Sequence, residues 1–120
     1  MKILIVDDST AQRIILKKIF KEKGYSDADI HQAGDGNDAL EKASQHDYEL
    51  ILMDLNMPKM DGLTCIKSMR KQNIKTPVVM VTSEGDQEKV NEAMKAGISY
   101  FITKPFLPEK LWSIVNSVLK

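Results

Sequence analysis

Three carboxylates follow two apolar runs of the sequence, and their types and spacing suggest a common site. Asp7 and Asp8 come directly after the apolar run 3–6, and Asp54 directly follows the apolar run 50–53. Like charges brought together cost free energy unless a cation or a proton offsets them. If both runs are buried strands, the three acids form a metal site, an acid/base site or a phosphoryl-transfer site.

The elements that must position these acids are predicted from apolar periodicity. Short, nearly continuous apolar runs indicate buried strands at 3–6, 50–53 and 78–81, with weaker runs at 28–33 and 100–102. Between and after these runs, apolar residues recur at helical spacing. These residues are Ile15, Ile19 and Phe20; Ala39, Leu40 and Ala43; Leu63 and Ile66; Val90, Ala93 and Met94; and Leu111, Ile114, Val115, Val118 and Leu119.

Helix and strand therefore alternate along the chain, which predicts a doubly wound α/β fold with a parallel sheet. Gly24 and Gly97 are placed to end the first and fourth helices, and Pro108 to begin the last one. Parallel strands need crossovers of helical length, and helices then cover both faces of the sheet.

In such sheets, ligands bind outside the carboxyl ends of the strands. Five polar residues lie at or just past predicted strand ends: Asp7, Asp8, Asp54, Thr82 and Lys104. A dinucleotide site would need a glycine-rich turn after the first strand, but that turn reads Asp7-Asp8-Ser9-Thr10. The sequence therefore disfavours a dinucleotide cofactor.

Composition narrows the class of protein. The 120 residues suit one domain, 1–120, with no output domain expected, and 17 basic residues balance 17 acidic ones, so no overall charge favours nucleic acid or an anionic membrane. The single cysteine, Cys65, and the absence of a signal-peptide pattern predict a cytoplasmic protein. His31 and His46 have no ligand-spaced companions and are predicted to be isolated residues at the surface or sheet edge.

The chemistry of the five polar residues is compatible with phosphoryl transfer. Mg²⁺ is commonly held by one or two carboxylates together with phosphate oxygens. The ammonium group of Lys104 can pair with a carboxylate and then with a phosphate oxygen, and the hydroxyl of Thr82 can hydrogen-bond a phosphoryl oxygen. Taken singly, Asp8 or Ser9 is as well explained as a helix cap, and Asp54 as the end of a strand.

Together, the motifs resemble the receiver domain of two-component response regulators over essentially the whole chain. The motifs are Asp7-Asp8; Asp54 with Met57-Pro58 and Asp61-Gly62; Val81-Thr82-Ser83; and Lys104-Pro105-Phe106. The resemblance implies a flavodoxin-like sheet with strand order 2-1-3-4-5 and five helices.

The resemblance also implies roles for the acids. Asp54 would be the phosphoacceptor, taking a phosphoryl group from a phosphohistidine of a sensor histidine kinase. Asp7, Asp8 and Asp54 would hold Mg²⁺, with the main-chain carbonyl of Asn56 as a further ligand. The domain would catalyse its own phosphorylation and dephosphorylation without being a turnover enzyme.

The remaining roles concern binding of the phosphoryl group and the switch that follows. Lys104 would bind the phosphoryl group, Thr82 would move toward it, and Phe101 would occupy the aromatic switch position. Many family members carry tyrosine at this position, so the hydroxyl is missing here. The neighbouring Tyr100 is predicted to point to the opposite face of its strand.

Two further positions and the expected partners complete the hypothesis. Asn56 and Glu84 resemble the residues that tune dephosphorylation in chemotaxis response regulators, which predicts a short-lived phosphorylated state. A downstream protein such as a flagellar motor switch would bind the face formed by helix 4, strand 5 and helix 5.

The alternatives are a phosphorelay intermediate that transfers to a histidine phosphotransferase and, in a different class, a Mg²⁺-dependent phosphatase with an aspartyl nucleophile. The phosphatase is disfavoured because such enzymes often carry a second acid where this chain has Asn56.

Overall fold

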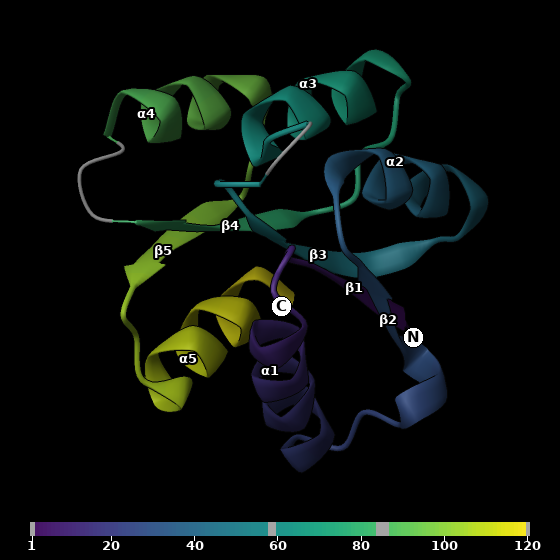
Figure 1. Cartoon of the computed structure of the whole chain (residues 1–120), viewed down its shortest axis with the longest axis vertical. Helices are drawn as coiled ribbons and strands as arrows, with labels where there is room; N and C mark the ends of the chain where they lie inside the picture. The colour runs from purple at the N-terminus through teal and green to yellow at the C-terminus, as the bar shows by residue number, and fades with distance from the viewer. Residues whose placement is uncertain (1, 58–59, 84–86, 120) are drawn as a thin grey trace.

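The computed structural model describes residues 2–57, 60–83 and 87–119, in which strands and helices alternate (Figure 1). The elements are β1 (Lys2–Val6), α1 (Thr10–Glu22), the 3₁₀ helix η1 (Asp27–Asp29), β2 (Ile30–Ala33), α2 (Gly36–Gln45), β3 (Tyr48–Asp54), α3 (Gly62–Lys71), β4 (Val78–Ser83), α4 (Gln87–Ala96), β5 (Tyr100–Lys104) and α5 (Pro108–Leu119). No helix within the described ranges is both long and apolar enough to cross a bilayer.

The five strands form one parallel sheet in the order β2-β1-β3-β4-β5. Helices α2, α3 and α4 cover one face, and α1 and α5 cover the other (Figure 1). The predicted doubly wound α/β fold, including its strand order, is confirmed. The chain adds β2 on one side of β1 and then crosses over to add β3, β4 and β5 on the other side. The direction in which strands are added therefore reverses between β1 and β3.

The core lies in two layers, one on each face of the sheet. Leu4 and Met53 pack with the apolar residues of α2, α3 and α4, whereas Ile5 and Leu52 pack with those of α1 and α5. Alternate residues of one strand therefore enter different layers. This burial on both faces explains why the central strands are continuous apolar runs in the sequence.

The start of the second strand was predicted too early. The run 28–33 is a strand only from Ile30, because residues 27–29 form η1, in which the Asp29 N–H donates to the Ser26 carbonyl (3.1 Å). The predicted helix boundaries hold: Gly24 and Gly97 lie just beyond α1 and α4 with φ of 101° and 106°, and α5 begins at the predicted proline.

The histidines are not isolated, which corrects one part of the sequence-based expectation, although His31 does lie on the edge strand β2 as predicted. The rings of His31 and His46 lie edge to face with centroids 4.9 Å apart, and His31 Nδ1 is 2.7 Å from the Tyr48 hydroxyl oxygen. Burial and the neighbouring His46 lower the pKa of His31. Tyr48 begins β3 and Asp54 ends it, so this cluster lies toward the end of the sheet away from the carboxylates.

Candidate functional site: a carboxylate cluster at the carboxyl edge of the sheet

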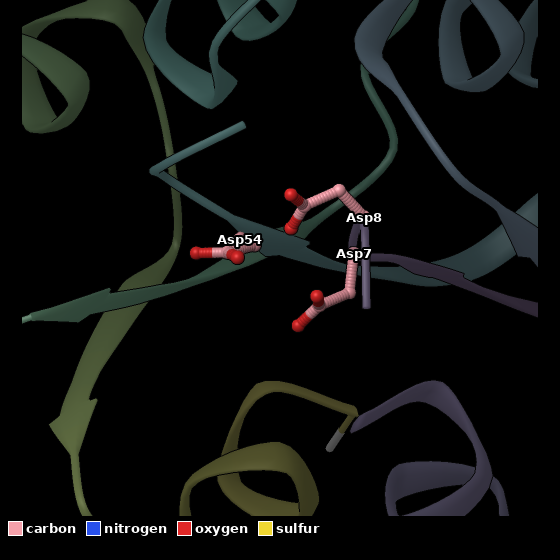
Figure 2. A group of neighbouring side chains, drawn as sticks. All are labelled: Asp7, Asp8 and Asp54. Atoms are coloured by element: carbon pink, nitrogen blue, oxygen red, sulfur yellow. The ribbon is translucent and has the colours of Figure 1, made fainter. Parts of the chain in front are cut away.

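The three predicted carboxylates meet at the carboxyl edge of the sheet (Figure 2). Asp7 and Asp8 follow β1, Asp54 is the last residue of β3, and one oxygen from each lies within 4.8 Å of the other two. Asp7 and Asp54 are 2% and 4% exposed, whereas Asp8 is exposed to solvent. The cluster therefore has two buried acids and one on its open side.

The sheet topology explains why these acids meet. β1 and β3 are hydrogen-bonded neighbours, with Val6 paired to Met53, so the residues that follow this pair leave the sheet side by side. The strand order also reverses between these two strands, where ligands of doubly wound sheets bind. The position of the cluster thus follows from the fold.

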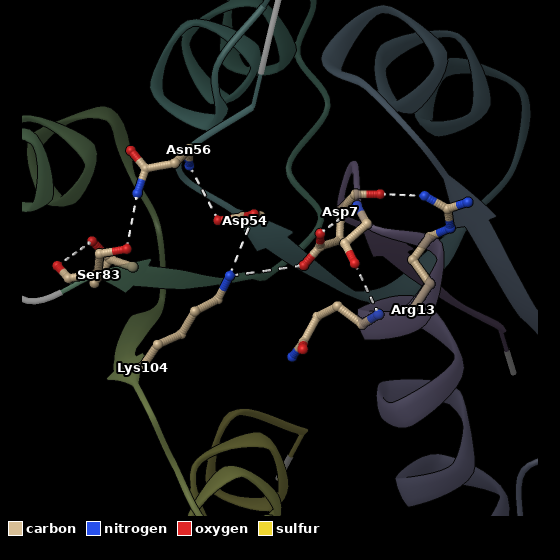
Figure 3. Close-up of polar contacts among 9 residues, drawn as sticks. Asp7, Arg13, Asp54, Asn56, Ser83 and Lys104 are labelled. Carbon is tan, nitrogen blue, oxygen red and sulfur yellow. Dashed lines mark hydrogen bonds and ion pairs between the residues drawn. The ribbon is translucent and has the colours of Figure 1, made fainter.

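Lys104, the last residue of β5, reaches the two buried acids. Its Nζ lies 3.5 Å from Asp54 Oδ2 and 4.0 Å from Asp7 Oδ2 (Figure 3). The predicted convergence of this lysine with the carboxylates is therefore confirmed. The peptide bond between Lys104 and Pro105 is cis.

Hydrogen bonds and burial set the electrostatics of the two inner acids. Asp7 Oδ1 accepts from the Ser9 N–H (2.8 Å), and Asp54 Oδ1 accepts from the Asn56 N–H (3.1 Å). Burial is the largest influence on both and raises the pKa of Asp7 and of Asp54; the N–H donors and Lys104 act in the opposite direction. The net effect favours the protonated carboxyl groups, so keeping both acids ionised costs free energy. A bound cation would offset that cost.

The side chains of the threonine and the asparagine lie beside the cluster, and both hydrogen-bond Ser83. Thr82 is buried in β4, and its hydroxyl donates to the main-chain oxygen of Ser83 (3.2 Å). The side-chain amide of Asn56 donates to the Ser83 hydroxyl at 3.3 Å (Figure 3). Glu84, which the sequence paired with Asn56, lies outside the described residues, as does Pro58.

The two aromatic residues of β5 differ in burial. Phe101 is half-buried and packs against the core layer under α2, α3 and α4, whereas Tyr100 is 48% exposed. Their ring centroids are 5.7 Å apart. This arrangement agrees with the alternation expected of a strand and gives Phe101 packing contacts in the core.

Arg13 is a residue of the site that the sequence analysis missed. It lies on α1, and its Nη1 donates to the main-chain oxygen of Asp7 at 2.5 Å (Figure 3). Gln32, on β2, accepts from Arg13 Nε at 3.2 Å. Apolar periodicity carries no signal for either residue, because both are polar and polar residues are ordinarily solvated.

A glycine next to the site allows two main-chain segments to approach closely. A Cβ added to Gly62 would lie 2.5 Å from the carbonyl oxygen of Asp54 and 2.9 Å from Cα of Leu55. Both atoms belong to the backbone, so an added methyl group must displace the end of β3 or the start of α3. Glycine at this position therefore allows α3 to begin against the strand that carries Asp54.

We expect Gly62→Ala to lower the free energy of unfolding by about 1–3 kcal/mol, the usual range for an overpacked site. Chemical denaturation followed by circular dichroism measures this change. Gly34→Ala is the matched control, because the nearest atom to its added Cβ is Arg13 Nη1 at 3.5 Å, an ordinary contact. Equal stability of Gly62→Ala and the parent would contradict the close approach.

The fold and the site together define a class of protein. It is a flavodoxin-like domain with an acidic cluster where the strand order reverses and with a lysine at the end of β5 facing that cluster. The profile of the response regulator receiver domain family matches residues 3–116. The chain belongs to this family.

Relatives and solved structures agree with this assignment. The chain is 38% identical to chemotaxis protein CheY1 of Helicobacter pylori, over 99% of this chain and 97% of that protein. It is 34% identical to chemotaxis protein CheY of Bacillus subtilis, over 98% and 97% of the two chains. The structure of chemotaxis response regulator CheY4 of Vibrio cholerae superposes with a TM-score of 0.87 at 35% identity, covering 98% of this chain and 97% of that one. A CheY-like receiver domain protein from Methanospirillum hungatei gives 0.90 at 29% identity, with coverage of 98% and 92%.

Proposed function

We propose that the protein is a phosphorylation-activated response regulator in which Asp54 accepts a phosphoryl group from a sensor histidine kinase. The observation that supports this most directly is the grouping of three carboxylates within 4.8 Å, with Lys104 Nζ 3.5 Å from Asp54 Oδ2. Phosphoryl transfer needs positioning and neutralisation of charge more than covalent chemistry from the protein. A buried acceptor with a cation beside it meets both needs.

The donor set of the site fits Mg²⁺. Carboxylate and carbonyl oxygens are the ligands this ion prefers, and the exposed Asp8 leaves a side open to solvent and substrate. Asp7, Asp8, Asp54 and the main-chain oxygen of Asn56 would hold the ion. When bound, it would supply neutralisation of the charge on the transferred phosphoryl group.

The chain's own residues then perform the transfer. A carboxylate oxygen of Asp54 attacks the phosphorus atom, a P–O bond forms, and the P–N bond to the donor histidine breaks with its electron pair on the imidazole nitrogen. Lys104 passes from its carboxylate partners to a phosphoryl oxygen, and the Thr82 hydroxyl turns toward the same group. The product is an acyl phosphate on Asp54, so the protein modifies itself and is not a turnover enzyme.

The output of the phosphorylated protein would be a protein–protein interaction in chemotaxis, since the relatives described above carry chemotaxis names. The face of α4, β5 and α5 is the proposed docking surface for a flagellar motor switch or a similar target. Tyr100 is exposed on β5, and a pocket between β5 and α5 includes Phe101 and Leu107. We place the protein in the cytoplasm, with residues 1–120 as a receiver domain that has neither nucleic-acid nor membrane partners.

Incubation with Mg²⁺ and a small acyl phosphate tests the proposal by intact mass. We expect one phosphoryl adduct that requires Mg²⁺, disappears when the ion is chelated and is absent from Asp54→Asn. Asp47→Asn, an exposed acid just before β3, removes the same charge far from the cluster and should retain the adduct. An adduct that persists in Asp54→Asn, or sustained hydrolysis of unrelated phosphate esters, would overturn the assignment.

A further inference from the structure

Asp7 is held by three hydrogen bonds at the point where β1 ends, two to its main chain and one to its carboxylate. The Asp7 N–H donates to the carbonyl of Ala33 (3.1 Å), and Asp7 Oδ1 accepts from the Ser9 N–H (2.8 Å). The main-chain oxygen of Asp7 accepts the third bond, from Arg13 Nη1 (2.5 Å). The guanidinium group therefore holds the peptide that carries one buried acid of the cluster.

The guanidinium of Arg13 is itself oriented by two other elements. Its Nε donates to Gln32 Oε1 on β2 (3.2 Å), and its Nη2 donates to Thr10 Oγ1 at the start of α1 (3.2 Å). Figure 3 shows the side chain reaching from α1 to the Asp7 carbonyl. A planar group with donors at fixed angles can make all three bonds at once, whereas a lysine ammonium at this position lacks that fork.

Two effects of Arg13 on a bound cation have opposite signs. As a positive charge beside the cluster, it would repel a metal ion and weaken binding. As a clamp on the Asp7 main chain, it would hold the carboxylate in place and strengthen binding. Its donors point at a main-chain oxygen and at two neutral side chains, none of which is a carboxylate of the cluster.

We propose that Arg13 is a positioning residue: with Gln32, it fixes the Asp7 main chain and so prepares the carboxylate cluster to bind Mg²⁺. This inference rests on the proposed function, since it assumes that the cluster is a Mg²⁺ site. Groups that orient metal ligands without touching the ion are worth about 10- to 100-fold in metal affinity.

The test is a Mg²⁺ titration of the full chain, followed by the backbone amide NMR signals of residues 7–9. We expect Arg13→Met and Arg13→Lys each to raise the Mg²⁺ concentration at half-saturation by about 10-fold, because both lose the fork. Lys18→Met removes a charge from an exposed position of the same helix and should leave the titration unchanged. Arg13→Lys keeps the charge and provides the test if Arg13→Met does not fold.

Gln32→Met checks whether the clamp acts as a unit. We expect Gln32→Met to weaken Mg²⁺ binding less than Arg13→Met does. The double variant should bind Mg²⁺ no more weakly than Arg13→Met alone, because both residues act through one hydrogen-bond chain. Tighter or unchanged binding in Arg13→Met would overturn the proposal, since charge repulsion would then outweigh or cancel any positioning effect. Parent-like affinity in Arg13→Lys would also overturn it.

The kinetic readout separates positioning from a general structural defect. In the acyl phosphate reaction, Arg13→Met should need about 10-fold more Mg²⁺ for its half-maximal rate but reach a rate close to that of the parent at saturating Mg²⁺. A loss of the maximal rate without this shift would count against positioning. If the parent forms no adduct at all, the proposed function fails, whereas the NMR titration still decides the role of Arg13.

Discussion

Lys104→Met is expected to slow the phosphorylation of Asp54 by about 100- to 1000-fold. The ammonium group is held 3.5 Å from Asp54 Oδ2, where charge would develop on the transferred phosphoryl group in the proposed reaction. Removing one such preorganised donor typically costs this factor in rate. Methionine retains the length and apolar stem of the side chain, so the variant isolates the loss of the charge.

The rate is measured as the formation of the phosphoryl adduct from a small acyl phosphate at saturating Mg²⁺. Lys110→Met is the matched control, because it removes an exposed lysine six residues further along the chain and should react at the parent rate. A Lys104→Met rate within about twofold of the parent would show that the ion pairs in the unphosphorylated structure have no counterpart in the transition state.

The position of the carboxylate cluster could be predicted from the sequence because it depends on the sheet alone. Strands buried on both faces appear as continuous apolar runs, and the residues that follow them in a parallel sheet share one edge. Asp54 directly follows such a run, whereas Lys104, 50 residues later, lies two residues past the weaker run 100–102 of the partly exposed strand β5. The strand order itself came from the resemblance to a family, since periodicity does not order strands.

The missed features depend on how side chains from different elements meet. Arg13 and Gln32 are 19 residues apart, and their bond depends on the packing of α1 beside β2. The contact of His31 with Tyr48 likewise joins strands that are not neighbours in the sheet. Spacing along the chain carries no record of either contact, because both are determined by packing after the elements have formed.

The buried carboxylates of the cluster should also reduce the stability of the protein. Burial raises the pKa of Asp54 above its ordinary value, and the charge of Asp7 acts in the same direction. The folded state therefore binds the Asp54 proton more tightly than the unfolded state does. The stabilisation from this group is complete below the unfolded pKa and is lost as the pH rises through the folded pKa. The cost of the buried charge therefore grows as the pH rises above the unfolded pKa.

We therefore expect Asp54→Asn to be more stable than the parent at pH 7, by on the order of 1 kcal/mol, without Mg²⁺. Asparagine is neutral at every pH and can still accept from the Asn56 N–H, so the gain should shrink as the pH falls toward 4. Chemical denaturation at a series of pH values measures it, with Asp47→Asn as the control that should show no gain.

Mg²⁺ should narrow or remove this difference in stability. The ion binds the folded parent and stabilises it by mass action, whereas the variant has lost one carboxylate of the site and should respond less. Added Mg²⁺ should therefore narrow or remove the advantage of Asp54→Asn, as seen in the denaturation midpoint at neutral pH. An advantage that is independent of Mg²⁺ would mean that the carboxylates do not share an ion. A parent more stable than Asp54→Asn without the ion would mean that Lys104 and the N–H donors already outweigh burial.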